Sequence, residues 1–77
     1  MRLSPSQEAI LRHLLRFGDD VPGNIGEEWG FHRTSISRSM PRLEEKGFVE
    51  PKGNGVWKLT NTGILVAQNL EWNDIDD

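Results

Sequence analysis

Three arginines in the middle of the chain are the side chains best suited to bind an anionic partner. Arg33, Arg38 and Arg42 fall within a stretch, Phe31 to Leu43, that contains no acidic residue. A guanidinium pairs with phosphate oxygens through two parallel hydrogen bonds, and it can also fork onto the O6 and N7 atoms of guanine. Serine and threonine hydroxyls in the same stretch suit phosphate contacts. These residue types in this spacing predict a nucleic-acid contact.

The residues around the arginines have the spacing of a helix-turn-helix. Gly26, Gly30 and Ile36 match a pattern in which a small residue lets two helices cross, a glycine forms the turn and an aliphatic residue fills the crossing. Alanine is usual at the first of these positions, so Gly26 departs from the pattern while remaining small. The turn needs a residue at positive φ, which glycine adopts without a steric penalty. We expect the second helix of this pair to read DNA.

Hydrophobic periodicity and capping residues predict the elements around this motif. Ser4, Pro5 and Gln7 indicate a capped helix start. The expected helices are residues 5–17, 22–29, 33–46 and 61–72, the expected strands are residues 48–50 and 56–59, and a very short strand is expected at Val21. The predicted fold class is mainly α with a small β-hairpin (α+β): a winged helix-turn-helix in the order α-(short β)-α-α-β-β-α.

Two local features carry specific expectations. Pro41 removes the hydrogen bond to the Ser37 carbonyl, so we expect a kink with the helix continuing beyond it. Asn54-Gly55 is a strong hairpin-turn dipeptide. Loops of two or four residues at this turn place the same side chains on the same face of the hairpin. Either loop places Phe48 beside Trp57 and Leu59.

Other single residues are assigned from their surroundings in the sequence. Trp29 and Trp57 are expected in the core, whereas His13 is expected at the surface rather than as a metal ligand. Leu65 and Trp72 are seven residues apart, on a side of the last helix that does not face the core. They are candidates for a dimer interface, with incidental exposure as the alternative.

Length and composition limit the class of protein. The chain has 77 residues and no cysteine, which suits one domain with a thin core and excludes disulfides and cysteine-based zinc sites. It contains no apolar run near the ~18 residues of a membrane span and no signal peptide, so a cytoplasmic protein is expected. We assign residues 1–72 to the winged helix-turn-helix DNA-binding domain and residues 73–77 to an acidic, disordered tail.

The net charge of −3 argues at first against a nucleic-acid partner. Four acidic residues and no base fall within residues 71–77, however, and without them nine basic residues face eight acidic ones. A local basic patch, rather than the overall charge, is what phosphate contact requires.

The runs ISRSMPRLEEKGFVE and VWKLTNTG resemble MarR-like winged-helix repressors. They are most similar to the small repressor-type proteins of haloarchaea and their viruses, and the resemblance covers about residues 5–70. It implies a DNA-binding transcriptional regulator that is usually dimeric. The candidate DNA-binding residues are His32, Arg33, Thr34, Ser35, Ser37, Arg38 and Arg42 on the recognition helix and Lys52, Asn54 and Lys58 on the wing.

The candidate residues have different expected roles. The N-terminal, outward half of a recognition helix enters the major groove, and there Arg38 is expected to read bases. Arg33 and Arg42 are expected to contact phosphates. Lys52 and Lys58 either reach the minor groove or the adjacent backbone, or serve only solubility.

The sequence therefore predicts a sequence-specific double-stranded DNA-binding transcriptional regulator, a repressor that binds a palindromic site as a homodimer. The alternative is a winged helix used for protein interaction without direct DNA reading, in which the arginines would be paired or flanked by exposed apolar residues. An enzyme is not expected, because the chain lacks a nucleophile–base pair, a glycine-rich phosphate loop and a buried carboxylate pair. No cofactor, metal, small-molecule ligand or membrane partner is expected.

Overall fold

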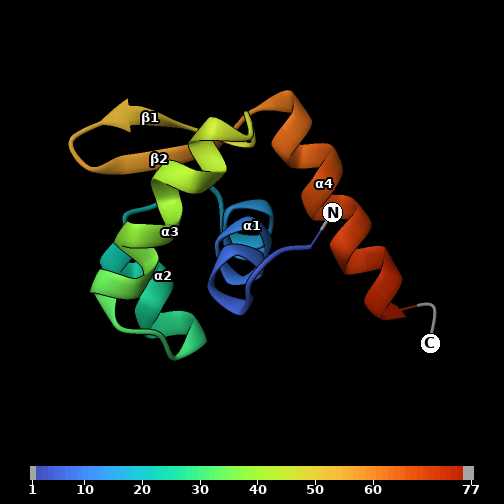
Figure 1. Cartoon of the computed structure of the whole chain (residues 1–77), viewed down its shortest axis with the longest axis horizontal. Helices are drawn as coiled ribbons and strands as arrows, with labels where there is room; N and C mark the ends of the chain where they lie inside the picture. Colours follow the sequence, from blue (N-terminus) through green and yellow to red (C-terminus); the bar gives the residue numbers. More distant parts are fainter. Residues whose placement is uncertain (1, 76–77) are drawn as a thin grey trace.

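The structure, a computed structural model, describes the backbone of residues 2–75 and the side chains of residues 2–72. Its elements are α1 (Pro5–Phe17), α2 (Pro22–Trp29), α3 (Arg33–Glu45), β1 (Val49–Gly53), β2 (Val56–Leu59) and α4 (Asn61–Ile75). Figure 1 shows α1 at the centre, with α2 and α3 on one side, α4 on the other, and the hairpin projecting from one end. This arrangement is a winged helix-turn-helix, and the predicted fold class is confirmed.

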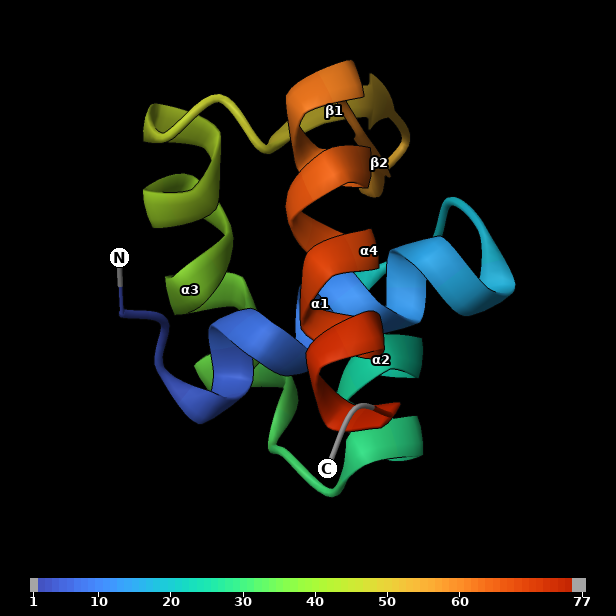
Figure 2. The same ribbon diagram turned by 90° about the vertical axis from the view of Figure 1, so that its right-hand side faces the viewer.

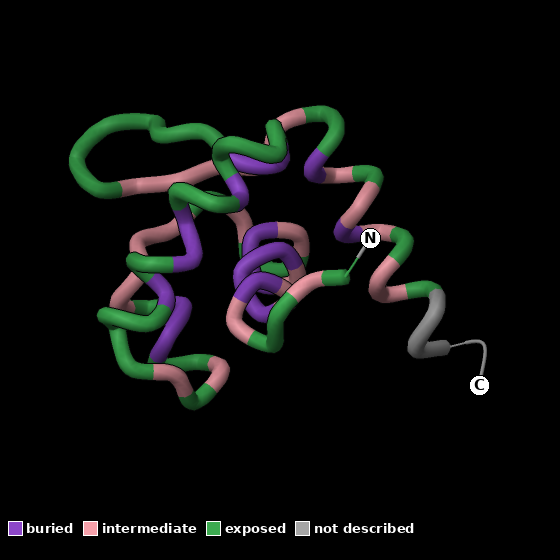
Figure 3. Tube along the Cα trace, viewed as in Figure 1, coloured by how far each residue is buried: buried purple, intermediate pink, exposed green. Residues whose placement is uncertain are grey.

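The core lies where α1 meets α3, and α4 covers α1 from the other side (Figures 2 and 3). Every helix and β1 contribute to it, as the periodicity predicts. The buried apolar cluster comprises Ile10, Leu11, Leu14, Ile25, Ile36, Met40, Leu43, Phe48, Val49 and Ala67. Trp29 and Trp57, which were expected in the core, are half-buried and pack against this cluster.

Local signals set the ends of the first helix. Ser4 caps α1, and its side chain and that of Gln7 form the reciprocal bonds of a capping box. Gly18 ends the helix at φ 93°, with its N–H bonded to the Leu14 carbonyl. Both boundaries agree with the prediction, because capping depends on residues close together in sequence.

The turn between α2 and α3 is tight, and it explains the small residue at position 26. Gly30 ends α2 in the left-handed region at φ 79°, as predicted, and the Phe31 N–H bonds to the Gly26 carbonyl at 2.9 Å. A Cβ atom on Gly26 would overlap the Phe31 carbonyl oxygen. The departure from alanine therefore follows from how closely the chain returns over α2.

The recognition helix α3 continues through Pro41 to Glu45, so the expected continuation is observed. Ile36, Met40 and Leu43 are buried on its inner side, as the spacing predicts. Gly47 follows the helix at φ 81°.

The hairpin register differs from the prediction. Asn54 and Gly55 both have positive φ and form the turn, but a bulge between Pro51 and Gly53 adds one residue to β1. A shift of one residue exchanges the two faces of a strand. Val49, rather than Phe48, therefore lies opposite Leu59 and on the face shared with Trp57.

The short strand expected at Val21 is also displaced by one residue. Asp20 forms an isolated bridge with Trp57 of β2, through backbone bonds of 3.1 and 2.8 Å. Val21 is not available for such pairing, because its N–H donates to Asp20 Oδ1 and its carbonyl accepts from Ile25. The bridge joins the wing to the loop between α1 and α2.

The prediction that His13 lies at the surface is wrong. His13 is 4% exposed, and both ring nitrogens are hydrogen-bonded, Nε2 to Asp20 Oδ2 at 2.8 Å and Nδ1 to Trp29 Nε1 at 3.1 Å. These partners come from the α1–α2 loop and from α2, so the spacing within α1 alone did not indicate them.

The last helix begins as predicted and ends later. Thr60 Oγ1 accepts a hydrogen bond from the Gly63 N–H at 3.0 Å, and Gly63 lies so close to Phe48, the residue before β1, that a Cβ there would overlap the Phe48 carbonyl. The helix runs to Ile75, three residues past its expected end at 72, so the predicted tail begins within it. Residues 76–77 of that tail lie outside the described residues. None of the described helices is long and apolar enough to cross a membrane.

Candidate nucleic-acid interface

The outward face of α3 presents the predicted recognition residues to solvent. His32 caps the helix, with Nδ1 accepting from the Thr34 N–H at 3.0 Å. The helix buries Ile36 and Met40 on its inner side, and the residues on its exposed side are polar. The exposed residues of this side are Arg33, Thr34, Ser35, Ser37, Arg38 and Arg42.

Within the described part of the chain, the basic residues divide into two groups. Four lie within 4 Å of a carboxylate: Arg12, Arg16, Lys52 and Lys58. The other five have no carboxylate that close among the described residues: Arg2, Arg33, Arg38, Arg42 and Lys46. Four of these five belong to α3 or its C-cap. The unpaired positive charge is therefore concentrated on and beside the recognition helix.

A hollow of 530 Å³ separates the start of α1 from the C-terminal half of α3, and we call it the α1–α3 hollow. Its polar lining includes Ser4, Gln7 and Ser39. Its charged lining is Arg2, Arg38, Arg42, Glu45 and Lys46, four cations against one carboxylate. All the described cations without a carboxylate partner, apart from Arg33, thus face one concave surface.

Two of these cations, Arg2 and Lys46, were not among the predicted site residues. Lys46 lies four residues after Arg42 and eight after Arg38, so helical spacing could have identified it. Arg2 precedes α1 and is 36 residues from Arg38 in the sequence, and only the packing of α1 on α3 brings them to one hollow.

One wing lysine is paired with a carboxylate of the α1–α2 loop, and the other is paired within the hairpin. Lys52 Nζ lies 2.8 Å from Asp19 Oδ2, and Lys58 Nζ lies 3.5 Å from Glu50 Oε1 across the hairpin. Asn54 is exposed at the hairpin tip. Both predicted wing lysines therefore have carboxylate partners, unlike the arginines of α3.

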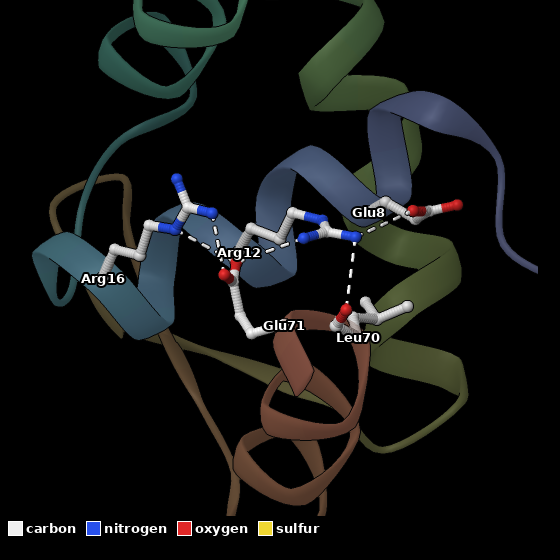
Figure 4. Close-up of polar contacts among 5 residues, drawn as sticks. All are labelled: Glu8, Arg12, Arg16, Leu70 and Glu71. Carbon is white, nitrogen blue, oxygen red and sulfur yellow. Dashed lines mark hydrogen bonds and ion pairs between the residues drawn. The ribbon is translucent and has the colours of Figure 1, made fainter. Parts of the chain in front are cut away.

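Glu71 of α4 is hydrogen-bonded to two arginines of α1 (Figure 4). Arg16 donates to both Glu71 oxygens, at 3.0 and 2.7 Å, and Arg12 donates to Glu71 Oε1 and to the Leu70 carbonyl, each at 3.4 Å. The hydrogen bonds from Arg16 are the main cause of a lowered pKa of Glu71; burial opposes this effect, and Arg12 adds to it. Arg16 also lies over the Trp29 ring, 5.3 Å from its centroid.

The two candidate dimer residues are exposed on α4. Leu65 is 67% and Trp72 is 61% exposed, while Ala67 is buried and Ile64, Val66 and Leu70 are half-buried. The helix therefore has the two apolar sides that its sequence predicts. Phe17 is a third large exposed apolar residue, and it was not singled out from the sequence.

No group of three or more metal-ligating side chains that could hold an ion occurs among the residues described. A second hollow, of 450 Å³, has acidic lining from Asp20, Glu27 and Glu28, and none of its lining residues belongs to α3.

A helix-turn-helix with a basic, exposed second helix, followed by a two-stranded hairpin, defines a winged-helix protein. The chain belongs to the MarR family, whose pattern matches residues 3–55. This match includes the helix-turn-helix and the first strand of the wing. No curated protein matches the chain.

Solved structures of MarR family proteins share the fold. NMB1585, a MarR family regulator from Neisseria meningitidis, is similar with a TM-score of 0.84 and 25% identity over 96% of this chain. ZitR of Lactococcus lactis, a zinc-responsive MarR family member, is similar with a TM-score of 0.79 and 20% identity over 99% of this chain, a likeness that shows the fold alone. The chain spans 56% of the length of each of these proteins.

Proposed function

We propose that the protein is a transcriptional regulator that binds double-stranded DNA sequence-specifically, with α3 in the major groove. The observation that carries this proposal is the division of the cations. Among the described residues, the cations of α1 and of the wing are paired with carboxylates, whereas those of α3 and its C-cap, like Arg2, are exposed without such partners. Exposed, unpaired cations on a helix-turn-helix suit phosphate contact. MarR family membership supports the same function.

Docking on another protein is the less favoured use of this surface. A protein interface has an apolar centre, often with aromatic residues. The large exposed apolar residues of the described chain are Phe17, Leu65 and Trp72, and none of them lies on α3. We propose no catalytic activity, and a DNA-binding regulator would act in the cytoplasm.

The residues of α3 have distinct proposed roles. Arg38, on the outward face, reads bases, because a forked contact with guanine discriminates by about 1–3 kcal/mol. Arg33 and Arg42 contact phosphates and set the position of the helix. His32, Thr34, Ser35 and Ser37 supply shorter polar contacts at the N-terminal end of α3, and Lys52, Asn54 and Lys58 extend the contact to the minor groove or adjacent backbone.

Selection of bound sites from random duplexes, followed by titration at several salt concentrations, tests this function. Binding should weaken steeply with salt, because each neutralised phosphate releases counterions. Arg38→Ala should reduce the preference for the selected site over other sequences, whereas Arg42→Ala should weaken binding to all sequences alike. Equal losses on all sequences for both variants would show that Arg38 does not read bases. A protein that selects no duplex would overturn the function.

We further propose that the regulator is a repressor that binds a palindrome as a homodimer through Leu65 and Trp72. Their exposure on one helix supports this, since buried together in a two-fold interface they would lose contact with water. Half-sites should then lie about one helical turn, ~34 Å, apart. We also propose that the protein is similar to haloarchaeal and viral repressors. In a cell that contains molar salt, phosphate contacts would contribute less, and base contacts would have to supply more of the affinity.

Sedimentation tests the dimer directly. Leu65→Glu combined with Trp72→Ala should yield monomers, while Phe17→Ala, which removes an exposed ring from α1 instead, should leave the mass unchanged. An unchanged mass in the double variant would rule out this interface without affecting the DNA-binding proposal, which depends on α3.

A further inference from the structure

We propose that the α1–α3 hollow is a binding site for a DNA backbone phosphate, so that Arg2 and Lys46 contact DNA together with Arg42. The inference rests on the proposed function and extends it. It assigns a role to the segment before α1 and to the C-cap of α3, neither of which belongs to the helix-turn-helix surface proposed to enter the groove.

The first support is the balance of charge. The four cations and one carboxylate that line the hollow give it a net charge of +3, in a chain whose net charge is −3. Even with Glu45 in the lining, none of these cations has a carboxylate within 4 Å among the described residues. Like charges held on one concave surface repel each other, and an anion placed among them removes that cost.

The second support is that the hollow is formed before any ligand binds. Ser6 Oγ and Ser39 Oγ are 2.6 Å apart, and this hydrogen bond joins the first turn of α1 to the middle of α3. Gln7, in the lining, is only 8% exposed and is held by its bond from the Ser4 N–H at 2.9 Å. A rigid polar floor with a charged rim needs little rearrangement to receive a phosphate.

The third support is the direction of the elements that meet there. Ser4 and Gln7 belong to the start of α1, so the positive end of that helix faces the hollow and adds to the field of the cations. Arg38, Arg42 and Lys46 follow each other at intervals of four residues, along one side of α3. Arg38, at the N-terminal end of this row, would then lie near the DNA bases. Arg42 and Lys46 lie further along α3 and would face the DNA backbone that borders the major groove.

The volume of the hollow is compatible with this ligand. At 530 Å³ it falls within the range of about 300–1,000 Å³ of small-molecule sites. It can therefore accept a phosphate together with part of its sugar.

The test uses Arg2→Gln and Lys46→Gln, singly and combined, in the full chain, with the duplex obtained by selection. The double variant should lower the slope of log affinity against log salt by about 1, the contribution of one phosphate. Each single variant should lower it by less, with the same loss on all sequences. Arg16→Gln is the matched control: it removes one positive charge that is paired with Glu71 and lies outside the hollow, so the slope should stay that of the wild type. Melting temperatures establish that the variants are folded.

Neutral methylphosphonate groups, placed at one backbone position of the duplex at a time, identify the phosphate. At one position, the substitution should weaken the wild type but leave the double variant unaffected, because the variant has already lost that contact. A folded double variant with the salt slope and affinity of the wild type would overturn the inference while leaving the proposed function intact. A wild-type chain that binds no duplex would instead overturn the function, and the inference with it.

Discussion

His13 Nε2 lies 2.8 Å from Asp20 Oδ2, and this contact ties α1 to the loop that precedes α2. The Trp29 indole N–H donates to His13 Nδ1, so Nδ1 carries no proton and Nε2–H donates to the Asp20 carboxylate. Asp20 Oδ1 accepts from the Val21 N–H and from Asn24. One buried imidazole thus orients α1, the loop and α2 relative to one another.

Asp20→Asn should destabilise the fold by about 1–3 kcal/mol at neutral pH, because the amide has an NH2 group in place of one of the two accepting oxygens. Either the buried ring N–H of His13, or the Val21 N–H and Asn24, then loses its acceptor. Burial raises the pKa of Asp20, but hydrogen bonds from His13, Asn24 and Val21 outweigh it and the pKa is lowered. A carboxyl group whose pKa is lowered by folding stabilises the folded state. This stabilisation is present at a pH above the ordinary pKa of the group and is lost as the pH falls through the lowered pKa. The difference between wild type and variant in urea unfolding should therefore shrink below about pH 4.

Asp19→Asn provides the control for this experiment, since Asp19 is an exposed neighbour whose partner is the exposed Lys52. It should change the free energy of unfolding by less than about 1 kcal/mol. Equal stabilities of the Asp20 variant and the wild type at every pH would contradict a structural role for the His13–Asp20 bond.

Glu71→Gln should loosen α4 from α1. It removes the charge that Arg16 and Arg12 share, and because Arg16 is 48% exposed we expect a loss of only about 1 kcal/mol. The pKa of Glu71 is lowered, so the stabilisation is present at neutral pH and disappears in acid as the carboxylate is protonated. Thermal unfolding at pH 7 and at low pH measures it. Glu8→Gln, which removes only a pair between neighbouring turns of α1, should cost less, and an equal cost would argue against a special role for Glu71.

Gly26→Ala should destabilise the helix-turn-helix by about 1–3 kcal/mol, because the added methyl overlaps the Phe31 carbonyl and forces the turn apart. Gly23→Ala is a matched control in the same helix. Its Cβ would meet only Arg33 Cδ, at 3.6 Å, and alanine favours a helix over glycine by about 0.5–1 kcal/mol. Denaturant unfolding of the two variants should therefore show opposite effects, and a stable Gly26 variant would mean that the turn can open freely.

Asp19→Asn should also tighten DNA binding if the wing reaches the backbone. Lys52 is paired with Asp19 at 2.8 Å, so a phosphate has to compete with that carboxylate. Without the Asp19 carboxylate, the affinity for DNA should rise, and the slope of log affinity against log salt should become steeper by up to about 1. Binding titrations with Asp19→Asn and Lys52→Gln measure both effects, and unchanged titrations for both would place the wing away from DNA.

The parts of the fold that were predicted correctly depend on short-range signals. The capping box at Ser4, the left-handed Gly30 and the inward spacing of Ile36 and Met40 each arise from residues within about one to two helical turns. Such interactions depend on local geometry, which a single sequence contains. The helix-turn-helix and its arginines followed from them.

The features that were missed depend on contacts between distant segments. One additional residue in β1 moved Phe48 off the hairpin face that carries Trp57 and Leu59, although the Asn54-Gly55 turn was placed correctly. His13 falls off the main apolar stripe of α1, and only Asp20 and Trp29 make its burial possible. The α1–α3 hollow likewise needs Arg2 and α3 to be packed together.

The three tryptophans occupy three different surroundings, so their intrinsic fluorescence can report on three different parts of the chain. Trp29 donates to His13 and lies under the Arg16 guanidinium, so release of α2 from α1 should change its emission. Trp57 lies in the wing at the bridge to Asp20, while Trp72 is open to water on α4 and should shift its emission to shorter wavelength when another surface covers it. Variants that retain one tryptophan at a time would follow the opening of the helix pair, the wing and the association of chains separately, without any added dye.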